Sequence, residues 1–295
     1  MIQFRLFQLF IFILYLFPSR WRRAFFISLS QLAYTVDAKH KRVIAQNLDF
    51  AFDGRLETSE VEAIGRYCYR NAALAFSQVI ENRTLGLERL KEQVAFANRD
   101  IVDKALDQKR PIIFVTAHYG NWEIAGAAIS NFLTPITVIY RKLNNPHFDR
   151  YLYESRKSIG IETVEKSGAA RALAKLLKSG GAVTLLTDQN TSKRDGVAVE
   201  FFGKPVHQTS TPAFLARKYD ALIIPLYTTT EDGEHYLVTF GEPIEVAKSD
   251  DAAADILEAT QQQAARHEEA IAKHPKYWFW CHRRWKTDYP EVYKS

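Results

Sequence analysis

Residues 111–128 read PIIFVTAHYGNWEIAGAA, and this stretch decides the fold. An apolar run typical of a buried strand ends at His118, and small residues typical of a helix follow from about Asn121. A strand that passes through a tight turn into a helix is the first half of a βαβ unit. In open α/β sheets, ligands bind where the strands end. The stretch therefore predicts an α/β sheet and a site beside His118.

The rest of the chain repeats the alternation of short apolar runs and helical patterns. Strands are expected at 111–117, 135–140, 182–187, 222–227 and 236–240. Helices are expected at 123–132, 146–159, 168–179 and 252–272, and residues 37–100 are expected to be helical as well. This alternation predicts an α/β fold with a mixed, largely parallel sheet flanked by helices, preceded by a helical N-terminal region.

Composition allows a large core and points to an acidic or membrane partner. The chain has 295 residues with 47% hydrophobic and 25% charged residues, which is ordinary for a globular protein. Its net charge of +5 gathers at the ends, since the first 23 residues contain four arginines and no acid. Such ends suit an anionic membrane or an acidic protein, and no nucleic-acid motif is present. Cys68 and Cys281 show neither metal spacing nor a disulfide framework, which favours a reducing compartment.

The N-terminus has the composition of a membrane element. Residues 6–17 contain one polar side chain, Gln8, and the run is shorter than the ~20 residues of a spanning helix. No signal-peptide cleavage site follows, and the arginines and Trp21 that come next suit the cytoplasmic headgroup layer. We therefore expect residues 1–23 to be an uncleaved membrane helix, with a buried core helix as the alternative. The main domain is then 24–295, with a helical part 24–105 and an α/β part 106–295.

Polar side chains follow three of the expected strands. His118 follows the first strand, Arg141 the second, and Asp188 and Gln189 the third. Each has an ordinary structural explanation: a satisfied core histidine, a surface salt bridge, a turn cap. If the strands are parallel, all of these groups line one crevice, and together they predict a functional site.

His118 and Glu123 are expected to form a general-base pair. Gly120 lies between them and breaks the helix, so the two side chains can meet across the turn. Glu123 would then fix the tautomer of His118, whose other nitrogen would take a proton, a contribution of typically ~10²–10⁴-fold in rate. No G-x-S-x-G, G-x-G-x-x-G, P-loop or H-E-x-x-H motif is present. The nucleophile is therefore expected to be a hydroxyl of the substrate.

The run from His118 to Glu123 resembles the H-x4-D/E signature of the glycerolipid-type acyltransferases. It most resembles the form in the late lipid A acyltransferases, which add lauroyl or myristoyl chains. Further segments match that family in order along nearly the whole chain: Arg42-Val43, Asn47-Leu48, Tyr140-Arg141, Asn144-Asn145-Pro146, Arg156 with Gly160, Thr187-Asp188-Gln189, Phe201-Phe202-Gly203, Pro212 with Leu215-Ala216, and His274-Pro275 with Trp278, Trp280, His282, Arg283, Arg284 and Trp285.

The resemblance implies a reaction and a role for each site residue. An acyl group would move from acyl carrier protein to a hydroxyl of a Kdo-bearing lipid A precursor, with His118 as base and Glu123 as its partner. Donors aimed at the developing oxyanion usually contribute the largest share of catalysis. The remaining roles implied are Arg156 at the oxyanion with backbone N–H groups near Gly120 and Asn121, Arg141 at a phosphate or carboxylate of the acceptor, and Asp188 and Gln189 shaping the crevice.

The same resemblance implies the partners and leaves alternatives open. Acyl carrier protein is expected as a co-substrate, with no resident cofactor and no metal, and the protein is expected on the cytoplasmic face of the bacterial inner membrane, held by its N-terminal helix. The acceptor could instead be a phospholipid, a glycolipid such as an acylated mannoside, or an ornithine lipid. A lipid carrier without turnover is a further alternative. The aromatic residues of 277–285 could lie at the membrane interface or close the core.

Overall fold

A computed structural model describes residues 2–294 of the chain. Within that range the main sheet has seven strands in the order β1-β9-β8-β2-β5-β3-β4. The strands from β8 to β4 run parallel, β9 is antiparallel to β8, and β1 runs parallel to β9. The strand bounds are β1 Val94–Ala97, β2 Ile112–Thr116, β3 Ile136–Tyr140, β4 Glu162–Glu165, β5 Ala182–Leu186, β8 Leu222–Thr229 and β9 Tyr236–Phe240, with a separate hairpin of β6 Gly196–Phe201 and β7 Lys204–Thr209. The predicted α/β fold with a mostly parallel mixed sheet is confirmed.

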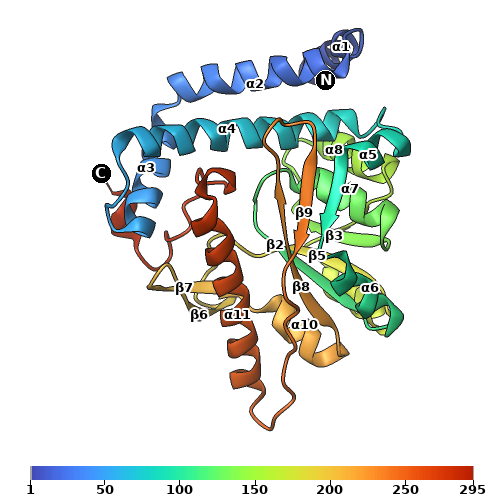
Figure 1. Cartoon of the computed structure of the whole chain (residues 1–295), viewed down its shortest axis with the longest axis vertical. Helices are drawn as coiled ribbons and strands as arrows, with labels where there is room; N and C mark the ends of the chain where they lie inside the picture. The colour runs from blue at the N-terminus through green and yellow to red at the C-terminus, as the bar shows by residue number, and fades with distance from the viewer. Residues whose placement is uncertain (1, 295) are drawn as a thin grey trace.

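Helices surround the sheet and extend above it (Figure 1). Their bounds are α1 Ile2–Tyr15, α2 Ser19–Val36, α3 Ala38–Phe52, α4 Thr58–Glu81, α5 Leu87–Gln93, α6 Arg99–Asp107, α7 Trp122–Phe132, α8 Pro146–Ser158, α9 Ala169–Lys178, α10 Thr211–Tyr219 and α11 Ala252–Lys273, with short 3₁₀ turns η1 Pro275–Tyr277 and η2 Pro290–Tyr293. The helices expected at 123–132, 146–159, 168–179 and 252–272 are confirmed to within a few residues. Helix α4 runs between α2 and the sheet in Figure 1.

Two parts of the sheet were not predicted. The region 37–100, expected to be helical, contains the edge strand β1, and β4 lies within a segment that had no strand assigned. Both have only four residues, and β4 reads ETVE, with one strongly apolar side chain. Strands this short give too few positions for a periodicity to show, so their pairing with β9 and β3 fixes them.

The strand that leads to the site is buried on both faces. Along β2, Ile112 and Phe114 pack into one core with α7, while Ile113 and Val115 pack into the other with α9 and α10. Alternate side chains of a strand point to opposite faces, so two covered faces explain the uninterrupted apolar run. The residues that follow β2 are therefore carried on a rigid support.

The C-terminal aromatic block closes the core. Trp278, Trp280 and Trp285 are 2%, 0% and 0% exposed, and they pack with the β6–β7 hairpin and with residues of α3 and α4. Of the two positions considered for residues 277–285, the structure therefore favours the core over the membrane interface. Cys68 of α4 and Cys281 of this block, distant in sequence, are free thiols whose Sγ atoms lie 3.8 Å apart.

The N-terminal segment forms two helices that meet at an angle in Figure 1. Pro18 separates α1 from α2, and Arg22 of α2 forms an ion pair with Glu81 at the end of α4. In the described chain no helix has the length and apolar character required to cross a bilayer. The expected N-terminal membrane helix is thus without support.

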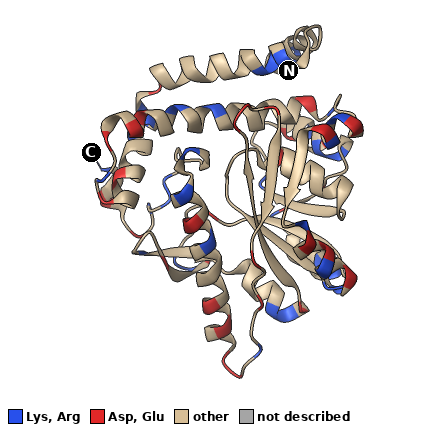
Figure 2. Ribbon diagram, in the orientation of Figure 1, with Lys and Arg blue, Asp and Glu red and all other residues tan. Residues whose placement is uncertain are grey.

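The outer side of α1 and α2 is nonetheless apolar, as the few charges on these helices in Figure 2 indicate. We call this surface the N-terminal apolar face. Its exposed large side chains are Leu6, Leu9, Phe10, Phe12, Ile13, Leu16, Phe17, Trp21, Phe25, Leu29, Leu32 and Val36.

Candidate active site

The pairing of β2 with β5 brings His118 next to Asp188. In this parallel pair Thr116 lies opposite Leu186. His118 and Asp188, each two positions further along its chain segment, therefore lie next to each other just beyond the two strands. The ladder continues past the strand ends, because the Thr187 N–H donates to the Thr116 carbonyl at 3.0 Å. His118 Nδ1 lies 2.9 Å from Asp188 Oδ1, and the His118 backbone N–H donates to Asp188 Oδ2 at 2.9 Å.

Asp188 is a buried, ionised carboxylate with three hydrogen-bond partners. Its side chain is 3% exposed, and the indole Nε1 of Trp278 donates to Oδ2 at 2.8 Å. Burial raises the pKa of Asp188, but the charge and hydrogen bonds of His118, with the bond from Trp278, outweigh it and hold the pKa well below its usual range. Asp188 therefore carries a fixed negative charge against the imidazole at neutral pH.

This geometry sets the tautomer of His118. An ionised carboxylate only accepts hydrogen bonds, so the proton on the neutral ring must sit on Nδ1, facing Asp188. Nε2 is left with its lone pair, and the Gln189 amide nitrogen lies 3.3 Å from it. The His118 side chain is 23% exposed, with the ring of Trp122 in edge contact at 5.1 Å. The arrangement presents a basic nitrogen at the surface of the sheet edge and buries the acid that orients it.

The expected hydrogen bond between His118 and Glu123 is not the one that the structure contains. Glu123 lies in the first turn of α7, and its carboxylate pairs with Arg156 of α8 through Nη2 at 2.5 Å and Nε at 3.1 Å. Both side chains are largely buried, at 6% and 13% exposed. Burial lowers the pKa of Arg156, but the adjacent Glu123 outweighs it and leaves the pKa above its ordinary value. The correction is that Asp188 takes the place expected for Glu123, because β5 adjoins β2 whereas α7 carries Glu123 toward α8.

The turn after His118 depends on Gly120. Its φ is +60°, and a Cβ there would lie 1.9 Å from the Thr228 carbonyl oxygen, so a side chain has no space. Asn121 ends the turn as the N-cap of α7 and accepts from the Ile124 N–H at 3.3 Å, so the predicted helix start is confirmed. The Gly120 N–H donates to the Tyr277 carbonyl at 2.9 Å. Gly120 is therefore committed to the fold, and its own N–H is bonded to a backbone carbonyl rather than free for the oxyanion role that the resemblance implied.

The C-terminal block holds the same turn from the other side. The Phe279 N–H donates to the His118 carbonyl at 2.9 Å, and Tyr119 forms a β-bridge with Trp278. His282 accepts from the Asn190 N–H at 3.1 Å, next to Gln189. The structure thus gathers His118, Asp188 and Gln189 as predicted. It pairs Glu123 with Arg156 instead of with His118, and it leaves Arg141 exposed in the loop after β3.

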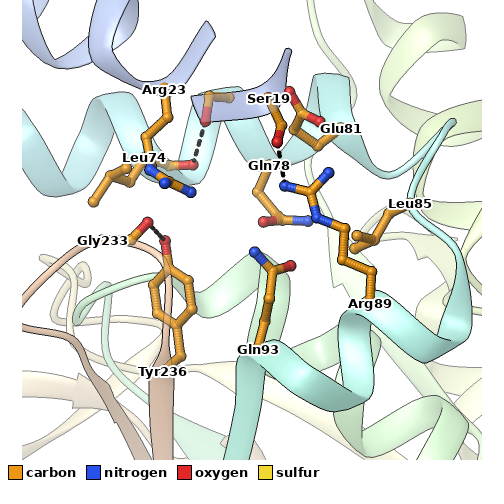
Figure 3. A pocket seen from close by; sticks show the side chains of 11 residues that line it. Ser19, Arg23, Leu74, Gln78, Glu81, Leu85, Arg89, Gln93, Gly233 and Tyr236 are labelled. Carbon is orange, nitrogen blue, oxygen red and sulfur yellow. Dashed lines mark hydrogen bonds between the residues drawn. The ribbon is translucent and has the colours of Figure 1, made fainter. Parts of the chain in front are cut away.

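A polar pocket lies elsewhere, between α2, α4, α5 and β9 (Figure 3). It is lined in part by Ser19, Arg23, Arg89 and Tyr236, and Arg89 donates to the Ser19 hydroxyl across it at 2.5 Å. None of the predicted site residues lines it. Its free volume of about 30 Å³ suits a few water molecules. Within residues 2–294, no group of three or more His, Cys, Asp or Glu side chains gathers in a way that could hold a metal ion.

The sequence did not reveal the residues of the C-terminal part of the chain that surround Asp188 and Thr187. In the sequence, Trp278 is only one residue of a block that matches the family, and nothing in the sequence distinguishes His267 or Tyr227 from core residues. The hydrogen bond from Trp278 to Asp188 joins residues 90 positions apart. No local pattern carries such a contact, which depends on how the C-terminal block folds back over the sheet.

A histidine paired with a carboxylate at the carboxyl edge of an α/β sheet, inside an H-x4-E run, is the arrangement expected of the acyltransferases that the sequence resembles. The chain belongs to the bacterial lipid A biosynthesis acyltransferase family, whose sequence profile matches residues 2–287. It is 28% identical to a phosphatidylinositol mannoside acyltransferase of Mycolicibacterium smegmatis over 204 residues, 68% of this chain and 65% of that protein. It is 21% identical over 277 residues to lipid A biosynthesis acyltransferase 2 of Shigella flexneri, covering 92% of this chain and 86% of the relative. The lipid A biosynthesis lauroyltransferase of Escherichia coli K12 is 28% identical over 182 residues, covering 61% of this chain and 58% of the relative.

Proposed function

We propose that this acyltransferase moves a fatty acyl chain from acyl carrier protein to a hydroxyl of a Kdo-bearing lipid A precursor, with His118 as the general base. The observation that carries the proposal is the His118–Asp188 pair, which leaves Nε2 unprotonated at the exposed end of the ring. Membership of the lipid A biosynthesis acyltransferase family supports the acceptor class. The mechanism uses the acyl donor as a co-substrate and calls for no resident cofactor or metal.

The chemistry follows from the placement of the proton. His118 Nε2 takes the proton of the acceptor hydroxyl while its oxygen attacks the thioester carbonyl, and Asp188 stabilises the imidazolium that forms. The new C–O bond produces an oxyanion, whose collapse breaks the C–S bond. The thiolate leaves with the proton from His118, so the ring returns to its starting tautomer. General-base help of this kind is worth about 10²–10⁴-fold in rate.

Arg156 is the cation proposed to stabilise the oxyanion of the transition state or to bind a phosphate of the substrate. Glu123 holds its Nε and Nη2, which fixes the guanidinium plane and leaves Nη1 without a hydrogen bond in the described chain. A fixed cation of this kind stabilises an oxyanion or binds a phosphate without reorganising. Glu123 then serves the reaction by positioning Arg156. Arg141, exposed after β3, is the proposed contact for an anionic group of the acceptor, and Gln189 is proposed to contact substrate beside Nε2.

We place the protein on the cytoplasmic surface of the inner membrane through the N-terminal apolar face. Side chains such as Phe12, Leu16 and Leu32 are more than half exposed on the two helices that carry it, and amphipathic helices bind in the plane of the interface. A flotation assay with phosphatidylglycerol vesicles tests this. Leu16→Asp with Leu32→Asp should release the protein, whereas Leu257→Asp, at an exposed position of α11 away from these two helices in Figure 1, should not. Equal binding by both variants contradicts the placement.

A second acceptor has a specific observation in its favour. The mannoside acyltransferase of M. smegmatis is more similar in sequence than the S. flexneri lipid A relative. A phosphatidylinositol mannoside is therefore the alternative acceptor, with the same base and the same acyl chemistry.

The test is an acyl-transfer assay with both acceptors and with acyl carrier protein and acyl-coenzyme A as donors. We expect the lipid A precursor and acyl carrier protein to be the favoured pair, and His118→Ala to lower kcat at least about a hundredfold. Preference for the mannoside would shift the proposal to the second acceptor. Unchanged acyl transfer by a folded His118→Ala protein would refute the mechanism.

A further inference from the structure

A histidine that the mechanism does not use lies buried behind the active site. His267 is on the inner face of α11 and is fully buried. Its Nε2 lies 2.7 Å from the Thr187 hydroxyl, and its Nδ1 lies 2.8 Å from the Tyr227 hydroxyl. Buried polar groups need partners, and this ring has one on each nitrogen.

The two partners of His267 belong to the two strands that flank β2. Thr187 directly follows β5 and precedes Asp188, while Tyr227 lies on β8. The His267 ring therefore ties the end of β5 to β8 beyond the last ladder bonds of β2. The Thr187 N–H donates to the Thr116 carbonyl, and its hydroxyl is hydrogen-bonded to His267. These two bonds fix the backbone at Thr187 and therefore the position of the next residue, Asp188.

The same helix also holds the residue after His118. The Tyr119 hydroxyl donates to the Ala270 carbonyl at 3.1 Å, one turn along α11 from His267. The rings of Tyr119 and Tyr227 lie in edge contact with centroids 5.5 Å apart. One face of α11 thus contacts the residue next to the base and the residue next to its carboxylate partner.

We propose that His267 is a positioning residue that sets the distance and angle between His118 and Asp188 through its hydrogen bond to Thr187. The inference rests on the proposed function, because it assigns a task to the same catalytic pair. A shift of about 1 Å in such a pair costs up to about a hundredfold in rate. His267 itself touches neither substrate nor His118 in this arrangement.

The chemistry of the ring suits a fixed connector. Burial lowers the pKa of His267 to about 4, against which the charge of Asp188 acts in the opposite direction. A neutral ring donates from one nitrogen and accepts at the other, so it satisfies both hydroxyls without bringing a charge next to Asp188. A leucine of similar size would leave both hydroxyls buried and unpaired.

Two conservative substitutions separate the two contacts. In His267→Gln the terminal amide occupies the region of Nε2 and can keep the bond to Thr187, whereas in His267→Asn it occupies the region of Nδ1 and can keep only the bond to Tyr227. We expect His267→Gln to retain kcat within about threefold and His267→Asn to lower it about tenfold or more. Thr187→Val, which removes the hydroxyl and keeps the shape, should match His267→Asn. Gln263→Leu, at a buried polar position one turn earlier on α11, is the control that should leave kcat and the His118 resonance unchanged.

The hydrogen bond between His118 and Asp188 distinguishes a positioning role of His267 from a purely structural one, because loss of core stability alone would leave that bond unchanged. In His267→Asn and Thr187→Val the hydrogen bond between His118 Nδ1 and Asp188 Oδ1 should lengthen, because Thr187 no longer holds Asp188 in place. The Nδ1–H proton resonance of His118 should move upfield in the same variants and stay in place in His267→Gln. If His267→Asn and Thr187→Val lose stability but keep the wild-type His118 resonance, His267 is a core residue only and the proposal fails. The resonance needs no turnover, so a wild-type protein inactive with every acceptor would refute the proposed function and still leave this inference tested.

Discussion

Acidification should destabilise the protein through His267 before most carboxylates titrate. The ring is neutral and fully buried, with a pKa lowered from 6.5 to about 4 by burial, whereas in the unfolded chain it takes a proton near its ordinary pKa. Between these values the unfolded state binds the additional proton. Stability is therefore fully present above about pH 6.5 and is lost as the pH falls toward about 4. The shift corresponds to about 3 kcal/mol in total, of which about 2 kcal/mol is lost by about pH 5.

The contribution of His267 to the pH dependence of the free energy of unfolding is measured by urea unfolding of the wild type and of His267→Gln. Glutamine does not titrate, so the free energy of unfolding of the wild type should fall between about pH 7.5 and pH 5 by about 2 kcal/mol more than that of the variant. In the wild type the charges of Asp188 and Arg284 act on the ring in opposite directions, since Asp188 raises its pKa and Arg284 lowers it. Parallel pH dependence in the two proteins would show that His267 is not a buried neutral group, and the reasoning would be wrong.

Two further predictions concern the turn and the buried ion pair. Glu123→Ala should lower the free energy of unfolding by about 3–5 kcal/mol, because it leaves the Arg156 cation buried without its partner; adding Arg156→Ala should restore part of the loss, and additive losses in a double-mutant cycle would contradict a coupled pair. Gly120→Ala should lower both the thermal midpoint and kcat, because its Cβ would lie 1.9 Å from the Thr228 carbonyl oxygen at a φ of +60°; a variant with the wild-type midpoint and activity would show that the turn can relax.

The elements that position the site were predictable where their patterns are long. The apolar run 111–117 and the small-residue helix after it become β2 and α7, and the polar residues after β2 and β5 meet at one sheet edge. These predictions depend only on local periodicity and on the rule that parallel strands share their carboxyl edge.

The partner of His118 was not predictable in the same way. Glu123 is five positions away and Asp188 is 70, and the choice between them depends on β5 being the strand next to β2. Strand order in a sheet is a property of the crossover connections, which the sequence pattern leaves open. Once that order is known, the pairing of Thr116 with Leu186 alone places Asp188 beside His118.

The hydrogen bonds by which the C-terminal third of the chain holds Asp188 and Thr187 join residues even further apart in sequence. Trp278 reaches Asp188 across 90 residues, and His267 reaches Thr187 across 80. Both side chains are of types common in a protein core, and burial alone does not distinguish a tryptophan that only packs from one that also donates a hydrogen bond to the Asp188 carboxylate. Only the folded geometry makes that distinction.

The most direct test of the account compares kcat for Asp188→Asn and Glu123→Gln in the acyl-transfer assay. Asparagine at 188 removes the charge and allows the wrong His118 tautomer, so we expect kcat to fall by about 10³–10⁴-fold. Glutamine at 123 keeps a hydrogen bond to Arg156 and leaves the His118–Asp188 pair intact, so we expect a loss of no more than about tenfold. The reverse order, with Glu123→Gln inactive and Asp188→Asn nearly unimpaired, would contradict the claim that Asp188 orients the catalytic histidine.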